Sequence, residues 1–105
     1  MPKTYNKLVR DRIPEIIERE GKTATVQEMQ PEAYLIALVD KLKEEVAEYA
    51  AGPAAEELAD IMEVVYALAE DRYGMSPQEL EALRQKKAAE RGGFKKRLLL
   101  VEVSD

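Results

Sequence analysis

A Gly-Pro pair at positions 52 and 53 interrupts the longest helix-forming stretch of this chain. Glycine is favoured just past the end of a helix, and proline is favoured in the first turn of the next one. Apolar side chains recur every three or four residues on both sides of the pair, as in two amphipathic helices. Because the connection between them is so short, the two helices are expected to fold back on one another as an antiparallel pair.

The same signals predict two further helices. Ser76 and Glu79 flank Pro77 in the pattern of a capping box with proline in the first turn, which marks a helix start. Pro14 marks the start of a short helix, and Gly21 marks its end. The expected helices cover residues 15–20, 31–51, 53–73 and 77–90.

Two segments outside these helices carry strand-forming residues. Residues 23–29 contain Thr and Val, and residues 94–103 are rich in Leu and Val. A lone strand would leave its backbone groups unpaired, so we expect the two segments to pair. The predicted fold is mainly α: an antiparallel helical bundle with a small two-stranded β element, formed as a single domain over residues 1–105.

The 105-residue chain contains neither cysteine nor histidine. This excludes disulfides, thiolate zinc sites and cysteine nucleophiles. It also removes the usual general base at neutral pH and the commonest nitrogen ligand of transition metals. Any chemistry must therefore use carboxylates, lysine, arginine, tyrosine, serine or threonine.

Charge and hydropathy argue against nucleic acid and membranes as partners. The formal net charge is −5, whereas a general nucleic-acid binder usually carries a basic excess. No apolar run approaches the roughly 20 residues that span a bilayer, and the first residues lack the apolar core of a secretory signal. We therefore expect a cytoplasmic protein with no nucleic-acid or membrane partner. A helical chain this small buries a thin core, so we also expect a homo-oligomer.

Four carboxylates are arranged symmetrically about the Gly-Pro pair. Glu48 and Glu57 lie equally far from it along the chain, and so do Glu45 and Asp60. In an antiparallel hairpin they would form two layers about 4.5 Å apart, given a rise of about 1.5 Å per residue. At about 100° of rotation per residue, both pairs lie on the same side of the two apolar stripes. The sequence thus predicts that the four acids converge along one groove.

Carboxylates at such range repel one another, and partial burial strengthens the effect by raising their pKa values. A hard divalent cation with oxygen ligands relieves this repulsion, and we expect Mg²⁺, with Mn²⁺ as the alternative. A di-iron site of the Glu-x-x-His type is excluded because the chain has no histidine. The competing interpretation is a solvated acidic helix face. Glu44 and Glu56 point elsewhere by the same rotation, and Glu63 is an ambiguous fifth acid.

At this point the sequence resembles a known family. The Glu-Glu-x-x-Glu run at 44–48, followed by Glu-x-x-Asp at 57–60, is similar to the metal-binding signature of the all-α nucleoside triphosphate pyrophosphohydrolases. That group includes MazG-like proteins, dimeric dUTPases and phosphoribosyl-ATP pyrophosphohydrolase. Tyr-Asn-Lys-Leu-Val-Arg-Asp-Arg-Ile-Pro at 5–14 and Lys-Ala-Ala-Glu-Arg-Gly-Gly-Phe at 87–94 resemble blocks of a short MazG-like house-cleaning branch.

The resemblance implies magnesium-dependent hydrolysis between the α- and β-phosphates of a nucleoside triphosphate, giving a monophosphate and pyrophosphate. Non-canonical nucleotides are the expected substrates of this branch. The resemblance also implies a homodimer or homotetramer with sites near subunit interfaces. The metal ligands, which are also the catalytic residues, map onto Glu45, Glu48, Glu57 and Asp60. One of these acids, or Glu44 or Glu63, would orient the attacking water as base.

The leaving pyrophosphate needs cationic support. Asn6 is a candidate for a hydrogen bond to the base or a phosphate, or alternatively for a turn cap. The predicted substrate-binding residues are Asn6, Lys7, Arg10, Lys87 and Arg91, with Lys86 as a further candidate cation. For each cation the alternative is an ordinary solvated side chain.

Two other functions remain open at this stage. One is phosphoribosyl-ATP hydrolysis, which the same family resemblance allows. The other is a non-catalytic helical oligomer that serves as a regulatory or partner-binding module. The blocks at 5–14 and 87–94 fit the house-cleaning branch better than phosphoribosyl-ATP hydrolysis.

Overall fold

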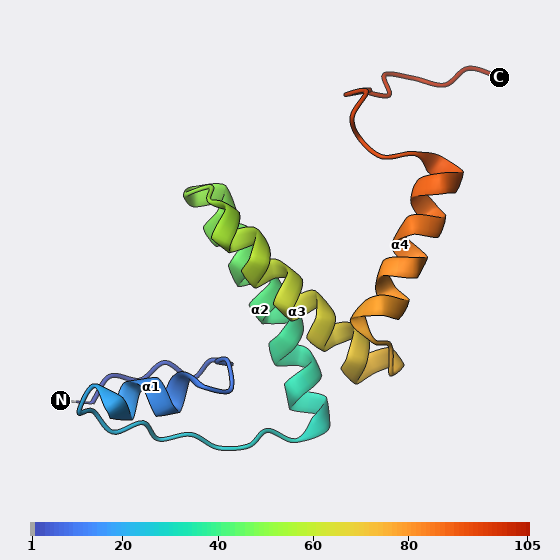
Figure 1. Ribbon diagram of the computed structural model, residues 1–105. Helices are drawn as coiled ribbons and strands as arrows, with labels where there is room; N and C mark the ends of the chain where they lie inside the picture. Colours follow the sequence, from blue (N-terminus) through green and yellow to red (C-terminus); the bar gives the residue numbers. More distant parts are fainter. Residues whose placement is uncertain (1) are drawn as a thin grey trace.

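The computed structural model describes residues 2–105, and these form four helices. They are α1 (Ile13–Arg19), α2 (Pro31–Ala51), α3 (Ala55–Tyr73) and α4 (Pro77–Arg91). Helices α2 and α3 pack against each other as an antiparallel hairpin, while α4 packs on α3 alone and projects away from the hairpin (Figure 1). The mainly helical fold predicted from the sequence is confirmed. None of the helices within 2–105 combines the length and apolar character that a bilayer span requires.

The helix ends follow the local sequence closely. Helix α4 has the predicted capping box: the Glu79 backbone N–H donates to Ser76 Oγ at 3.1 Å, and the Ser76 N–H donates to Glu79 Oε1 at 3.2 Å. Helix α3 ends at Tyr73 and is capped by Gly74, whose φ of 61° suits a residue without a Cβ. It begins two residues later than predicted, because Ala54 is extended at φ −151° and joins Gly52 and Pro53 in the loop.

The expected β element is not confirmed. Neither 23–29 nor 94–103 forms a strand in the part of the chain that the structure describes. The first segment joins α1 to α2 at one end of the molecule, whereas the second follows α4 at the opposite end (Figure 1). Helix α4 therefore separates the two segments that the sequence suggested would pair.

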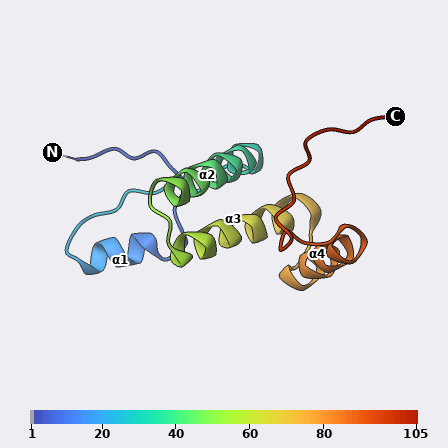
Figure 2. The ribbon, with the colours of Figure 1, turned by 90° about the horizontal axis from the view of Figure 1, so that it is seen from above.

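The hydrophobic core is thin. Leu38, Val64 and Ala69 are the buried apolar residues of the described chain. The radius of gyration is 18.3 Å, whereas a compact chain of this length would have about 13 Å. Viewed from above, α1 and α4 lie at opposite ends of the α2–α3 hairpin (Figure 2). Much of the apolar surface that normally fills a core therefore faces outward.

The capping box gives a direct test of how α4 is held. Ser76→Ala removes the acceptor of the Glu79 N–H and should destabilise the first turn of α4 by about 1 kcal/mol. The measurement is amide hydrogen exchange of residues 78–82. Ser104→Ala, in the coil after α4, is the matched control and should leave this exchange unchanged. Equal protection in both variants would show that the cap does not stabilise α4.

Candidate metal centre

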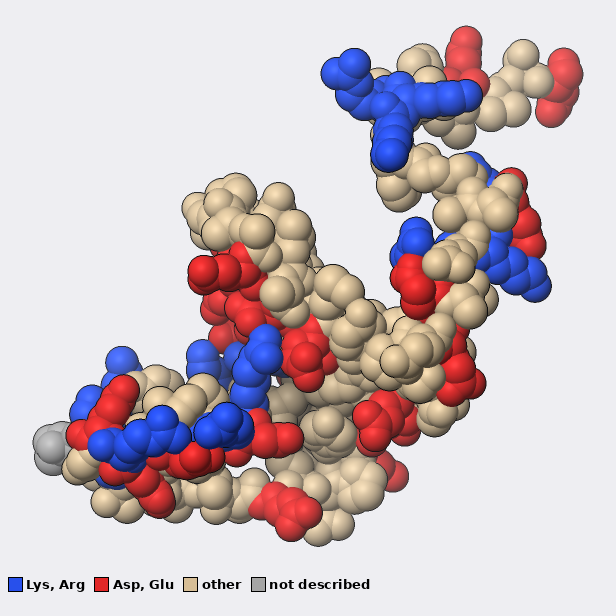
Figure 3. Space-filling view, viewed as in Figure 1, with Lys and Arg blue, Asp and Glu red and all other residues tan. Residues whose placement is uncertain are grey.

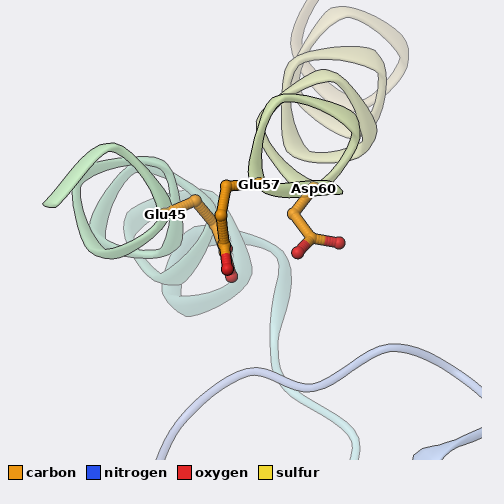
Figure 4. Close-up of side chains that lie close together, drawn as sticks. All are labelled: Glu45, Glu57 and Asp60. Carbon is orange, nitrogen blue, oxygen red and sulfur yellow. The ribbon is translucent and has the colours of Figure 1, made fainter. Parts of the chain in front are cut away.

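Three carboxylates from the two hairpin helices converge at one place. Glu45 on α2 and Glu57 and Asp60 on α3 each offer an oxygen, and these oxygens lie within 4.8 Å of one another. The side chains of Glu45 and Glu57 point the same way and end together, with Asp60 beside them (Figure 4). We call these three residues the acidic centre. The structure thus brings together three of the four acids that the register argument selected.

Glu48 does not join this group. It is exposed and lies three residues after Glu45, which leaves the two side chains about 60° apart around α2. Its charge is nevertheless close enough to act on the centre, because it contributes to the raised pKa of Glu45. Glu48 therefore lies at the rim of the acidic centre.

Glu45 is the most constrained member of the centre, with 7% of its surface exposed. Burial raises the pKa of its carboxyl above the usual range, and the charges of Glu48 and Asp60 raise it further. Lys41 opposes this shift through an ion pair 3.5 Å from Glu45 Oε1. A buried carboxylate in this position is stabilised either by a proton or by a cation.

Two oxygens of the centre have no hydrogen-bond partner among the described residues. They are Oε2 of Glu45 and Oε2 of Glu57, and both are buried. A buried polar atom without a partner is destabilising, and it normally indicates a missing ligand or water. Three carboxylates with two unpaired oxygens match the oxygen ligands that Mg²⁺ and similar hard cations prefer. The residues present therefore fit a divalent cation.

The N-terminal segment supplies positive charge to the same place. Lys7 Nζ lies 2.9 Å from Glu44 Oε1, and Arg10 donates to Asp60 Oδ1 at 2.6 Å. Lys41, one turn before Glu45, lies 3.3 Å from Glu44. Lys and Arg side chains gather beside the acidic side chains of the hairpin (Figure 3). The acidic centre is thus partly neutralised by cations from two elements.

A groove of about 390 Å³ runs between this segment and the hairpin. Its walls include residues 8–12 of the N-terminal segment, Tyr34 and Lys41 of α2, and the part of α3 that carries Asp60 and Glu63. Glu45 lies in its wall, so the acidic centre opens into the groove. The groove therefore combines carboxylates, cations and an aromatic ring.

The predicted substrate-binding residues are divided between two places. Arg10 contacts Asp60 of the acidic centre, and Lys7 contacts Glu44 beside it, as described above. Asn6 is exposed, with a positive φ of 45° that asparagine tolerates better than most residues. Lys87 and Arg91 are exposed on α4, which packs on α3 but not on α2. They lie apart from the acidic centre of their own chain.

Sequence reasoning did not select Lys41. Its spacing of three and four residues before Glu44 and Glu45 is the helical ion-pair pattern and could have identified it. Tyr34 also lines the groove. It is half-buried in the groove wall, where burial raises the pKa of its hydroxyl.

Comparison with known proteins adds one partial relative. A stretch of 41 residues, 39% of this chain, is 51% identical to a protein of Mycolicibacterium smegmatis described as uncharacterized. The match spans 42% of that protein's length. No family model matches the chain, and no solved structure matches it. The function of the acidic centre therefore rests on the chemistry of its own residues.

Metal binding tests the centre directly. Glu57→Gln keeps the side-chain shape but removes a charged ligand, and should weaken Mn²⁺ binding by about 10-fold or more, as loss of metal-supporting groups does. Calorimetry or water-proton relaxation measures this affinity. Glu56→Gln makes the same charge change at the exposed neighbouring position and should leave the affinity nearly unchanged. Equal affinities in the two variants would contradict the assignment.

In the metal-free protein, removing the charge of Glu45 is expected to stabilise the fold. Because its pKa is raised by folding, ionised Glu45 destabilises the folded state above the usual carboxyl pKa. Glu45→Gln should therefore raise the melting temperature at neutral pH in EDTA, and the gain should shrink as acid protonates Glu45 in the parent. With excess Mg²⁺ the order should reverse, because only the parent binds the ion well.

Differential scanning fluorimetry with and without Mg²⁺ measures both effects. Glu28→Gln, an exposed acid in the linker before α2, is the control and should shift neither melting temperature. A Glu45→Gln variant less stable than the parent in EDTA would show that the Lys41 ion pair outweighs the burial of Glu45.

Proposed function

We propose that this chain is a divalent-metal-dependent nucleoside triphosphate pyrophosphohydrolase. It cleaves between the α- and β-phosphates of non-canonical nucleotides and releases a nucleoside monophosphate and pyrophosphate. The observation that carries the proposal is the acidic centre, with two buried unpaired oxygens, opening into a groove that Arg10 and Lys41 also line. The family resemblance of the motifs supplies the reaction.

In this proposal Glu45, Glu57 and Asp60 hold Mg²⁺ or Mn²⁺. When bound, the cation would neutralise phosphate charge and polarise the phosphorus under attack. Glu48, the fourth ligand implied by the resemblance, is exposed at the rim. A change of its side-chain rotamer is the step by which it would join the other three.

Lys7 and Arg10 would bind the triphosphate. Both side chains are about half exposed, at 46% and 54%, and exposed ion pairs contribute only about 0–1 kcal/mol. They can therefore exchange a carboxylate partner for a phosphate with little loss. An arginine suits this role because its guanidinium forms paired hydrogen bonds to phosphate oxygens. These cations would stabilise the leaving pyrophosphate.

Two carboxylates outside the acidic centre were candidates for the base. Lys7 and Lys41 both contact Glu44, and the hydrogen bond from Lys7 lowers its pKa. A carboxylate held in this way is a weak proton acceptor. Glu63 lines the groove one turn beyond Asp60, and no ion pair engages it among the described residues. We therefore assign Glu63 the role of holding the attacking water and accepting its proton.

The proposal includes a homodimer or homotetramer. Its support is the thin core together with the large apolar side chains left exposed on α2 and α3. The position of Lys87 and Arg91 also supports an oligomer. Tyr73, at the end of α3, is about 20 Å along the helix from Asp60, and α4 then leads further away. A contact between these two cations and a nucleotide would therefore come from a second copy.

The decisive experiment is product analysis. The protein is incubated with Mg²⁺ and a panel of canonical nucleotides, oxidised or deaminated nucleotides, and phosphoribosyl-ATP, and products are resolved by ³¹P NMR. We expect pyrophosphate and a monophosphate, with damaged nucleotides turned over fastest. Glu57→Gln should lower kcat/KM by about 100-fold or more, since the cation provides several kcal/mol of stabilisation. Glu56→Gln should retain the parent rate.

Release of orthophosphate would contradict the cleavage position. Preference for phosphoribosyl-ATP would move the protein to the biosynthetic alternative. If the folded, metal-loaded protein releases pyrophosphate from no member of the panel, the enzymatic proposal fails and a non-catalytic helical module remains.

A further inference from the structure

The segment after α4 exposes a dense group of apolar side chains. We call residues 94–105 the C-terminal arm. Its six large apolar side chains are between 79% and 97% exposed: Phe94, Leu98, Leu99, Leu100, Val101 and Val103. Single exposed apolar residues are ordinary, but a contiguous group of this size marks an interaction site. The arm therefore requires a surface to cover it.

The hairpin carries a matching surface. At about 100° per residue, Leu58 and Met62 lie about 160° around α3 from Asp60, so they face away from the acidic centre. On α2 the exposed valines lie 100° to 120° from Glu45, on the same side as this pair. We call the four residues the apolar face; they are 39–51% exposed: Val39, Val46, Leu58 and Met62.

The arm does not reach this face within its own chain. Helix α4 is 15 residues long, about 22 Å, and carries the arm to the far end of a molecule 63 Å in length. The arm and the hairpin are well separated in Figure 1. A second copy can approach the apolar face without any change in α4.

The charges favour contact between the C-terminal arm of one copy and the hairpin of another over contact between two hairpins. Residues 31–73 hold eleven acidic and three basic residues, a net charge of −8. Residues 86–97, at the base of the arm, hold six basic and one acidic residue, a net charge of +5. Two hairpins repel each other, and so do two copies of residues 86–97, whereas residues 86–97 of one copy attract the hairpin of another.

Full burial of both arms would remove about as much surface as a stable dimer needs. Full burial of a Leu, Val or Phe side chain removes roughly 60–120 Å² of apolar surface by the transfer relation. Six side chains from each of two arms give on the order of 1,000 Å², before the surface they cover is counted. Stable interfaces bury about 1,200–2,000 Å² in total.

We propose that the C-terminal arm of one copy docks on the apolar face of a second copy, and that the exchange is reciprocal. The product is a twofold dimer in which residue 100 of each chain lies near residue 62 of the other. Lys95, Lys96 and Arg97 lie along the acidic hairpin of the partner. This interface gives a form to the homo-oligomer included in the proposed function, but it uses the side of the hairpin opposite the acidic centre and does not depend on catalysis.

The absence of cysteine allows a clean cross-linking test in the full chain. Leu100→Cys and ¹⁵N-labelled Met62→Cys proteins are mixed, left to exchange subunits and oxidised, and disulfides are identified by mass spectrometry. We expect the mixed disulfide between residues 100 and 62 to dominate. Glu18→Cys, exposed on α1, replaces Met62→Cys as the control. A 100–62 yield no greater than the 100–18 yield would overturn the proposal.

Sedimentation equilibrium provides an independent test. The unaltered chain should be a dimer at micromolar concentration. Removal of residues 94–105, which leaves α4 whole, should give a monomer with unchanged helical circular dichroism. The full-length Leu99→Asp/Leu100→Asp variant should weaken the dimer by at least about 100-fold, because a buried unpaired charge is strongly unfavourable. A monomeric parent, or a dimer that survives both changes, would overturn the proposal.

Discussion

The packing of α2 against α3 brings like charges together, and the rest of the molecule is arranged around that conflict. Apolar residues such as Leu38 and Val64 hold the two helices face to face. The same contact brings Glu45 to within ligand distance of Glu57 and Asp60. Hydrophobic burial is non-directional and collectively large, so it can impose an electrostatic arrangement that the carboxylates alone would avoid.

The negative charge of the hairpin also positions the N-terminal segment. No helix of the described chain packs against α1, so Lys7 and Arg10 attach this part of the chain to the hairpin mainly through charge. Exposed ion pairs of this kind are screened by salt and readily exchanged. The segment that closes the groove is therefore held by weak interactions, whereas the carboxylates are held by a rigid helical pair.

Much of the hairpin could be predicted from the sequence because its determinants are local. Gly52 and Pro53 mark the turn, helical periodicity gives the two faces, and a count from the turn matches Glu45 with Asp60. The same count also matches Glu48 with Glu57, but it does not give the direction of the Glu48 side chain. That direction depends on rotation about α2 and not on distance from the turn. About 60° of rotation around α2 separates the buried Glu45 from the exposed Glu48, and the turn alone does not fix that rotation.

The parts that sequence reasoning missed depend on contacts between distant segments. Residues 94–103 have strand-forming composition, but composition does not reveal whether a partner strand lies within reach. In the structure α4 carries this segment away from residues 23–29, so no pair forms within the chain. The contacts of the N-terminal segment with the hairpin are also hard to predict, because they join distant positions. Lys7 and Glu44 are 37 positions apart, and Arg10 and Asp60 are 50 positions apart.

The ion pair between Arg10 and Asp60 ranks the ligands that the groove can accept. A free cation can replace Arg10 beside Asp60, but it leaves the guanidinium without an anion. Inorganic phosphate can take the guanidinium, but it leaves the carboxylates without a counter-charge. A cation and a phosphate that arrive as one complex satisfy both halves of the pair together. Under the proposed function, this geometry would select for a metal–phosphate complex over either of its components alone.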